Sequence, residues 1–234
     1  MKAIETFSFL KENSYENNVL VHTYKEGSRK GSSFIEDYAF LMNASLNLYT
    51  ATFDASYYDF AQELNMTASK YYLDGDSSMF RYNKDQELIS KIIKTDDGVL
   101  PSPNAMMAHN LFQIGHIEYN PEFLERSKKM LSAMSSMIRT NASSYGKWNS
   151  LMLNHAYPYF EIAVVGKQAK SMVASLHEDY IPNALIVGSD DESEMPLFKD
   201  RYEPDDTFIY VCQNTTCKLP VKTVKEALKQ LDSF

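Results

Sequence analysis

The sequence predicts a mainly α-helical fold, built from helical hairpins, that is followed by a small α/β subdomain. Between residues 35 and 140 the apolar side chains recur at the spacing of one helix face. Two hairpins in this stretch align at a single offset without a gap. After residue 157 the pattern changes to short apolar strands around an amphipathic helix, which is typical of a βαβ unit. We therefore predict a helical-hairpin domain over residues 1–157 and an α/β subdomain over residues 158–234.

The composition limits the partners. The chain of 234 residues carries 23 Lys and Arg against 31 Asp and Glu, a net charge of −8, and the basic residues are spread out. A phosphate-binding surface needs concentrated positive charge, so nucleic acid is not an expected partner. No stretch approaches the ~20 apolar residues that cross a bilayer, and the first residues lead into an amphipathic helix rather than a signal core. We expect a soluble, cytoplasmic protein with no membrane partner.

The two hairpins are expected over residues 35–72 and 103–140. Asp54 interrupts the first apolar pattern and is the predicted N-cap of the next helix. Asn120 and Pro121 restart the second pattern, and Pro121 suits a first helical turn because an N–H has no partner there. The two breaks are 120 − 54 = 66 residues apart, and the same offset pairs Leu41 with Met107, Leu48 with Ile114, Tyr57 with Phe123 and Leu64 with Met130. Such a repeat suggests hairpins that stand side by side in a curved or closed array.

Further elements flank the hairpins. Near the N-terminus, Ile4, Phe7 and Leu10 share one face, as in the closing helix of a hairpin. Residues 143–155 resemble the opening helix of a third hairpin. In the α/β part, the predicted strands are "YFEIAVVG", "NALIVGS" and "TFIYVC", and the predicted helices are "KQAKSMVASLHEDYIP" and "VKTVKEALKQLDSF".

A short run of β-forming residues precedes each hairpin, at residues 20–24 and 79–82. A polar loop follows each run, "KEGSRKGSSFIED" and "NKDQELISKIIKTDDGVLPS". In an array of parallel hairpins, equivalent loops lie on the same rim. We therefore expect the acid pairs Glu36-Asp37 and Asp96-Asp97 to face one common mouth, formed by the loops 22–38 and 94–104.

Carboxylates on neighbouring loops suit glycoside hydrolysis, which needs two acids roughly 5 to 9.5 Å apart. Glu36, Asp37 and Asp97 are the candidate catalytic residues, as general acid or base. The alternative interpretation is structural, and it is the more frequent one. Acids such as Glu36 and Asp37 at a helix start cap N–H groups and complement the dipole, and Asp97-Gly98 is an ordinary turn pair.

The loop "DDGVLPSPN" is predicted to be the lip of the site, because Pro101 and Pro103 stiffen the backbone around Ser102 more than a helix cap requires. Ser102 or Asn104 can still cap the following helix. Several aromatic residues, such as Phe34 and Tyr82, lie near these loops and can stack on sugar rings, although core packing is the more common role. The candidate ligand-binding residues are His22, Tyr24, Arg29, Tyr38, Asp96, Ser102 and Asn104.

No cofactor or metal is expected. The histidines show no metal-ligand spacing, and no Gly-x-Gly-x-x-Gly occurs near Gly166 or Gly188. Cys212 and Cys217 are in a context where thiols close a small disulfide or bind a metal. Two ligands do not complete a zinc site, and the spacing is not the redox Cys-x-x-Cys, so a structural or idle pair is the preferred interpretation.

Four segments in this order, "EDYAFLMNASLNLYTATFD", "DGVLPSPNAMMAHNL", "FEIAVVG" and "YVCQNTTCKLPV", resemble a family of thioredoxin-domain-containing, spermatogenesis-associated proteins. Members of that family begin with a thioredoxin-like domain and continue into a six-hairpin (α/α) toroid, similar to those of glycosidases and N-acylglucosamine epimerase. The resemblance implies that this chain corresponds to the C-terminal third. It therefore implies a partial six-hairpin toroid with a C-terminal α/β subdomain, without the thioredoxin-like domain and the first hairpins.

Two functions are consistent with these features. The first is a carbohydrate-active-like toroid fragment that binds a saccharide or another polar small molecule at the loop rim. The alternative is a non-catalytic interaction module that works with a thioredoxin-like domain. A piece of a ring leaves hairpin faces uncovered, so self-association, or pairing with a chain that supplies the missing hairpins, is also expected.

Overall fold

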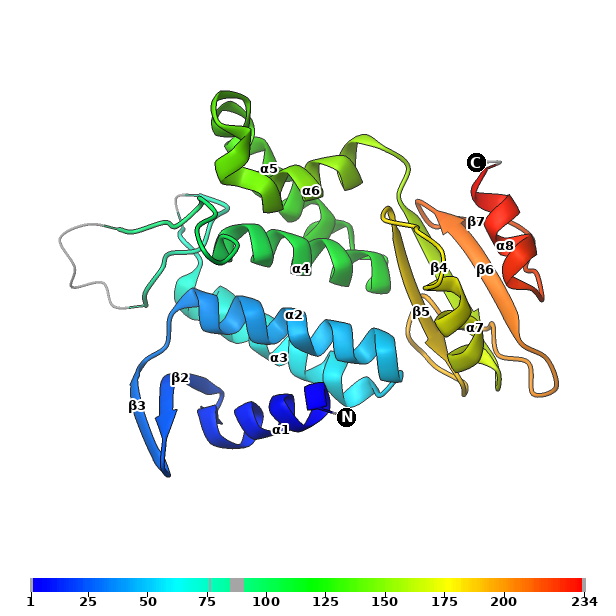
Figure 1. Cartoon of the computed structure of the whole chain (residues 1–234), viewed down its shortest axis with the longest axis horizontal. Coiled ribbons are helices and arrows are strands. Elements are labelled where there is room, and N and C mark those ends of the chain that lie inside the picture. The colour runs from blue at the N-terminus through cyan, green and yellow to red at the C-terminus, as the bar shows by residue number, and fades with distance from the viewer. Residues whose placement is uncertain (1, 76, 85–90, 233–234) are drawn as a thin grey trace. The chain divides into compact units, whose positions relative to one another are not determined.

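A computed structural model describes residues 2–75, 77–84 and 91–232, so the predicted loop 83–102 lies partly outside the described residues (Figure 1). About half of the chain is helical and two small sheets accompany the helices, which confirms a helix-rich fold with an α/β part. The toroid stays a prediction. Within the described ranges, no helix combines the length and the apolar character that crossing a membrane requires. The elements are α1 (Lys2–Ser14), β1 (Tyr15–Glu16), β2 (Val19–Lys25), β3 (Ser28–Ser32), α2 (Ile35–Thr52), α3 (Ala55–Tyr72), α4 (Pro103–Glu118), α5 (Pro121–Thr140), η1 (Ala142–Tyr145), α6 (Gly146–Ala156), β4 (Phe160–Val165), α7 (Ala169–Leu176), β5 (Ala184–Ser189), β6 (Phe208–Gln213), β7 (Thr216–Cys217) and α8 (Val224–Leu231).

The chain divides into two compact units. The first comprises Met1–Tyr49, Asp54–Asn110 and Arg126–Asn149. The second comprises Thr50–Phe53, Leu111–Glu125 and Ser150–Phe234. The predicted α/β residues thus fall in one unit together with three segments from earlier in the chain, and the predicted boundary at residue 157 stays a prediction.

The two helical hairpins have the same connector. Between α2 and α3, Phe53 has φ +65° and Asp54 Oδ1 accepts the backbone N–H of Ser56 at 2.9 Å. Between α4 and α5, Tyr119 has φ +52° and Asn120 Oδ1 accepts the backbone N–H of Glu122 at 3.0 Å. Each connector therefore joins a left-handed aromatic residue to an Asx cap. Because these positions are 66 residues apart, the offset found in the sequence also describes the backbone geometry.

The first unit contains a small antiparallel sheet in the order β1-β2-β3. The predicted strand 20–24 is confirmed as part of β2. The β2–β3 turn has two central residues with positive φ, Glu26 at +51° and Gly27 at +79°, as a tight hairpin requires. Arg29 of β3 donates to the carbonyls of Asn13 and Glu12, at 2.6 and 2.8 Å, and so satisfies the C-terminal end of α1.

The second run of β-forming residues, 79–82, does not join a sheet. Its bridges among the described residues are isolated ones, Leu73 with Phe80 and Phe34 with the next residue, Asn83, and the N–H of Tyr82 donates to the carbonyl of Ile92 at 2.7 Å. A side chain takes the place of a strand partner here. Asn104 accepts the N–H of Phe80 at 2.8 Å and donates to its carbonyl at 3.0 Å. An amide side chain offers the same donor and acceptor as a backbone unit, so it completes the extended segment without a second strand.

The second unit is built on a four-stranded sheet in the order β5-β4-β6-β7, with β4 and β5 parallel and the other pairs antiparallel. One face of the sheet packs on α7 and α8 through an apolar cluster that includes Ile162, Val164, Ile209 and Val211 (Figure 1). β4 is buried along its whole length, which explains its continuous apolar sequence. Gly166 follows β4 with φ +127°, and a Cβ at this position would lie 2.4 Å from the carbonyl oxygen of Asp206, so only glycine fits.

Candidate functional site

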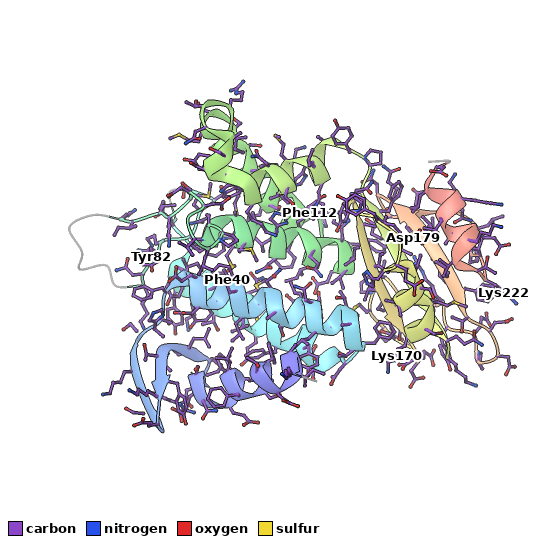
Figure 2. The ribbon with its side chains drawn as sticks, in the orientation of Figure 1. Phe40, Tyr82, Phe112, Lys170, Asp179 and Lys222 are labelled. Carbon is purple, nitrogen blue, oxygen red and sulfur yellow. A yellow bond between two sulfur atoms is a disulfide. The ribbon has the colours of Figure 1, made fainter. Side chains whose placement is uncertain are left out.

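A cavity of about 360 Å³ lies in the first unit, between α1, β2 and the first half of α2. Its walls are mainly apolar, and one end is polar. The lining residues are Leu10, Ser14, Leu20, Val21, His22, Glu36, Asp37, Phe40, Leu41, Ala44 and Leu100. Figure 2 labels Phe40 on α2 and Tyr82, which contacts Glu36. Three of the predicted site residues, His22, Glu36 and Asp37, therefore share one hollow with a residue of the second predicted loop, Leu100.

The first turn of α2 fixes Asp37. Its Oδ2 accepts the backbone N–H of Phe34 at 2.8 Å, which is the third-residue half of a capping box. His22 of β2 lies beside the same carboxylate, with Nδ1 at 3.0 Å from Oδ1 and 3.1 Å from Oδ2. A carboxylate only accepts, so the proton of this contact is on Nδ1. The His22 side chain is 41% exposed and that of Asp37 is 21% exposed, so the pair reaches solvent at the cavity.

Among the described residues, the partners of the Glu36 carboxylate are side chains. The hydroxyl of Tyr82 donates to Oε1 at 3.0 Å, and the ammonium of Lys94 donates to Oε2 at 3.4 Å. Burial, together with the bond to Glu36, raises the pKa of Tyr82 to about 12. Tyr82 therefore remains a neutral donor to this carboxylate over the physiological range.

A row of aromatic side chains adjoins His22 and Glu36, which line the cavity. The rings of Phe34 and Tyr82 stack at 4.7 Å, the His22 ring meets Phe34 edge-on at 4.9 Å, and the Lys94 ammonium lies 5.5 Å from the Tyr82 ring centre. In the sequence, Phe34 and Tyr82 are near the predicted loops but are not among the predicted site residues, and Lys94 is not predicted. Lys94 is the first residue of the predicted 94–104 loop, so its position could have indicated it. A single lysine in a polar loop, however, has no neighbouring motif that would mark it as a binding residue.

Asp97 does not line the cavity. Its Oδ1 accepts the N–H of Ser102 at 2.7 Å and its Oδ2 accepts the N–H of Lys147 at 2.8 Å, in the first turn of α6. Burial lowers the pKa of Lys147, and the charge of Asp97 opposes that shift. Both oxygens of Asp97 thus accept backbone N–H groups, which agrees with the structural interpretation of the Asp97-Gly98 turn. The catalytic role of Asp97 stays a prediction, and so do those of Glu36 and Asp37.

Ser102 and Asn104 are fully buried and build the second loop. The Ser102 hydroxyl accepts the N–H of Ala105 at 3.2 Å and donates to the carbonyl of Lys94 at 3.3 Å. Asn104 donates to the same carbonyl at 2.9 Å. These two residues therefore position Lys94 beside Glu36 and do not themselves reach the cavity.

The remaining predicted binding residues lie elsewhere. Tyr38 is buried and its hydroxyl accepts the N–H of Leu20 at 3.1 Å, while burial raises its pKa. Tyr24 packs edge-on against Phe9 at 5.6 Å. Arg29 serves the end of α1, and Asp96 is exposed. None of these four lines the cavity. In the described part of the chain, no group of three or more His, Cys, Asp or Glu could hold a metal ion.

The comparisons with known proteins give relatives by sequence. The human spermatogenesis-associated protein 20 is 26% identical over 213 residues, which are 85% of this chain and 27% of that protein. The rat protein of the same name is 23% identical over 212 residues with the same coverage, and an uncharacterized protein of Caenorhabditis elegans is 22% identical over 90% of this chain and 30% of that protein. The chain is thus homologous to the spermatogenesis-associated protein 20 family and spans about a quarter of the length of these relatives. No protein-family model matches it.

A solved structure of a glycoside hydrolase is similar to part of this chain. A GH76 α-mannanase of Bacteroides thetaiotaomicron superposes on 58% of this chain and 37% of its own, with a TM-score of 0.47 and 15% identity. A TM-score of this size does not establish a shared fold. The thioredoxin-like domain and the missing hairpins stay predictions.

Proposed function

We propose that the cavity of the first unit binds a saccharide, or a small polyhydroxylated molecule with one apolar face. The observation that carries this proposal is the single cavity shared by His22, Glu36 and Asp37. Its volume of about 360 Å³ is at the lower end of the range for small-molecule sites. A ligand of one or two sugar rings matches that size.

The chemistry of the lining favours this class of ligand. Carboxylates such as Glu36 and Asp37 accept hydrogen bonds from hydroxyl groups, and these charge-assisted bonds are among the stronger ones. The C–H face of a sugar ring packs against apolar walls, which Leu20, Phe40 and Leu41 supply. Two acids in the first turn of one helix disfavour an anionic ligand, because their charges repel it.

Binding is better supported than hydrolysis. Each carboxylate at the cavity already accepts two contacts, Glu36 from Tyr82 and Lys94, and Asp37 from His22 and the backbone N–H of Phe34. A general acid or base must exchange protons with substrate, so one of these contacts has to give way first. The side-chain contacts of Glu36 can do so more easily than the backbone contact of Asp37.

The test is a panel of mono- and disaccharides, followed by ligand-observed NMR and calorimetry on the full chain. We expect at least one saccharide to bind, and Glu36→Gln to weaken it by roughly tenfold, because a charged hydrogen bond is lost. Glu122→Gln is the matched control, since Glu122 is an exposed acid in the first turn of α5. Failure of the whole panel to bind, or equal affinities for Glu36→Gln and wild type, would contradict the proposal and favour the interaction module.

A further inference from the structure

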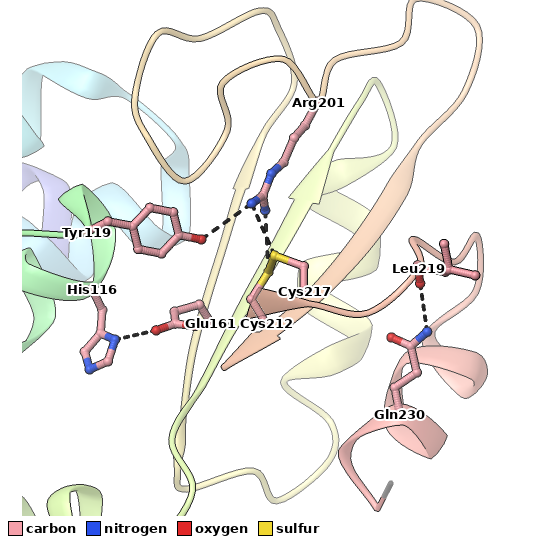
Figure 3. Close-up of a disulfide and its surroundings, with 8 residues drawn as sticks. All are labelled: His116, Tyr119, Glu161, Arg201, Cys212, Cys217, Leu219 and Gln230. Carbon is pink, nitrogen blue, oxygen red and sulfur yellow. Dashed lines mark hydrogen bonds and ion pairs between the residues drawn. A yellow bond between two sulfur atoms is a disulfide. The ribbon is translucent and has the colours of Figure 1, made fainter. Parts of the chain in front are cut away.

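A disulfide joins β6 to β7 in the second unit. Cys212 and Cys217 are directly opposite in the antiparallel pair and form this bond (Figure 3). Of the alternatives that the sequence left open, the structure therefore has the small disulfide. The two sulfurs differ in access, because Cys212 is buried and Cys217 is partly exposed. An external thiol therefore reaches Cys217 first.

One arginine faces both sulfurs. The guanidinium of Arg201 lies with Nη2 at 3.4 Å from Cys217 Sγ and Nη1 at 3.7 Å from Cys212 Sγ (Figure 3). Its other contacts hold it there. The Tyr119 hydroxyl is 3.5 Å from Nη2, and the guanidinium lies 4.7 Å from the Tyr210 ring centre. In the described ranges, no carboxylate forms an ion pair with Arg201, so its charge is directed at the sulfurs.

This contact favours the reduced form of the pair. A disulfide sulfur is a weak acceptor and carries no charge, so a guanidinium gains little from it. A thiolate at Cys217 would instead form a charge-assisted contact with Arg201. Neighbouring cations are what make cysteine thiolates reactive in proteins.

A buried carboxylate completes the arrangement. Glu161 of β4 is directly opposite Cys212 of β6, so the two side chains share one face of the sheet. His116 Nδ1 lies 2.6 Å from Glu161 Oε1, whereas Oε2 is buried and has no hydrogen-bond partner among the described residues. Reduction gives Cys212 an S–H donor on the same face as this unpaired acceptor. The geometry thus favours a thiol at Cys212 and a thiolate at Cys217 in the reduced pair.

We propose that Cys212 and Cys217 are a redox-active pair that exchanges with a dithiol, and that Arg201 stabilises the thiolate of the exchanging residue Cys217. A thiolate of the dithiol attacks Cys217 Sγ and forms a mixed disulfide. The bond between the two cysteine sulfurs breaks, and its electron pair goes to Cys212, which takes up a proton. The second thiolate of the dithiol then attacks the first sulfur of the dithiol, which is bonded to Cys217 in the mixed disulfide. The bond to Cys217 breaks, and Cys217 leaves as a thiolate. Two electrons pass from the dithiol, which is oxidised to a disulfide, to the protein.

The experiment measures reduction of the folded full chain by dithiothreitol, with alkylation and mass spectrometry as the readout and circular dichroism to follow the fold. We expect reduction without unfolding, with Cys217 alkylated before Cys212. Arg201→Gln should slow reduction by on the order of fivefold, because Arg201 faces both sulfurs and its cation is lost from the thiolate that leaves in each step, Cys212 in the first and Cys217 in the second. Arg201→Lys should be intermediate, since it keeps the charge and loses the planar fork.

The matched control is Lys199→Gln, which removes an exposed cation from the same loop. It should reduce at the wild-type rate. A disulfide that is closed to thiols and only supports the fold would be reduced only when the chain unfolds. Three results would overturn the proposal: reduction only on unfolding, an unchanged rate of reduction in Arg201→Gln, or alkylation of Cys212 before Cys217.

Discussion

Two acidic segments of similar sequence, Glu36-Asp37 before the body of α2 and Asp96-Asp97 before α4, have different partners in the structure. Both oxygens of Asp97 accept backbone N–H groups, in the 97–102 turn and at the start of α6. Both oxygens of Glu36 accept side-chain donors, and Glu36 lines a cavity. Asp37 is between these cases, with one backbone donor and one histidine.

The difference separates acids that support the fold from acids that are available to a ligand. A backbone N–H cannot turn away without moving the chain, so a carboxylate that caps it is not available to a ligand. The Tyr82 hydroxyl and the Lys94 ammonium rotate on their own side chains, so a ligand hydroxyl can replace either of them. The partners of a carboxylate, more than its position in a loop, therefore identify the candidate binding residue.

The largest effect on stability is expected at the support of the second loop. Asn104→Ala should lower the free energy of unfolding by about 3 kcal/mol, because the buried N–H of Phe80 and the carbonyls of Phe80 and Lys94 lose their partner. Urea unfolding measures this change. A loss below about 1 kcal/mol would mean that the loop does not depend on this amide.

A smaller loss in the free energy of unfolding is expected for Asp97, the acid that caps backbone N–H groups. Asp97→Ala should cost about 2 kcal/mol, since two backbone N–H groups lose a charged acceptor. Asp96→Ala is the neighbouring control, and we expect it to stay within about 0.5 kcal/mol of wild type because Asp96 is exposed. Equal unfolding midpoints for the two variants would contradict the distinction between these residues.

Asp37 should show an intermediate effect. Asp37→Asn keeps one acceptor for the Phe34 N–H and loses the charged contact with His22, so we expect a cost of about 1 kcal/mol. Thermal and urea unfolding at neutral pH measure it. A cost as large as that of Asp97→Ala would place Asp37 with the acids that support the fold.

The smallest effect concerns the proton of Tyr82. Its pKa is raised to about 12, first by burial and then by Glu36. The unfolded chain loses this proton near pH 10, so the contribution of Tyr82 to stability is present below pH 10 and is lost as the pH rises toward 12. In Glu36→Gln the burial remains and the negative charge is gone, so the pKa of Tyr82 should fall partway toward its usual value. A titration of tyrosine labelled with ¹³C at Cζ measures this, and an unchanged pKa would show that Glu36 has no effect on Tyr82.

The sequence predicted the hairpins and their breaks because a 3.6-residue period and an Asx cap are local signals, as at Asp54 and Asn120. It predicted that Glu36-Asp37 and Asp96-Asp97 face one mouth, because equivalent loops of parallel hairpins lie on the same rim, whereas of these four acids Glu36 and Asp37 line the cavity and Asp96 and Asp97 do not. It did not distinguish Asp97 from Glu36, since the partners of Asp97 include an N–H fifty residues away, at Lys147. The same limit applies to Arg201, whose contact with the two sulfurs depends on the fold of a long polar loop.

The assignment of the binding site to the cavity is tested most directly by comparing the affinities of Glu36→Gln and Asp97→Asn for a saccharide that the wild-type chain binds, with both variants confirmed to be folded. We predict that Glu36→Gln binds roughly tenfold more weakly and that Asp97→Asn binds as wild type does. Equal losses in the two variants, or a loss in Asp97→Asn alone, would contradict the assignment of the binding site to the cavity beside Glu36.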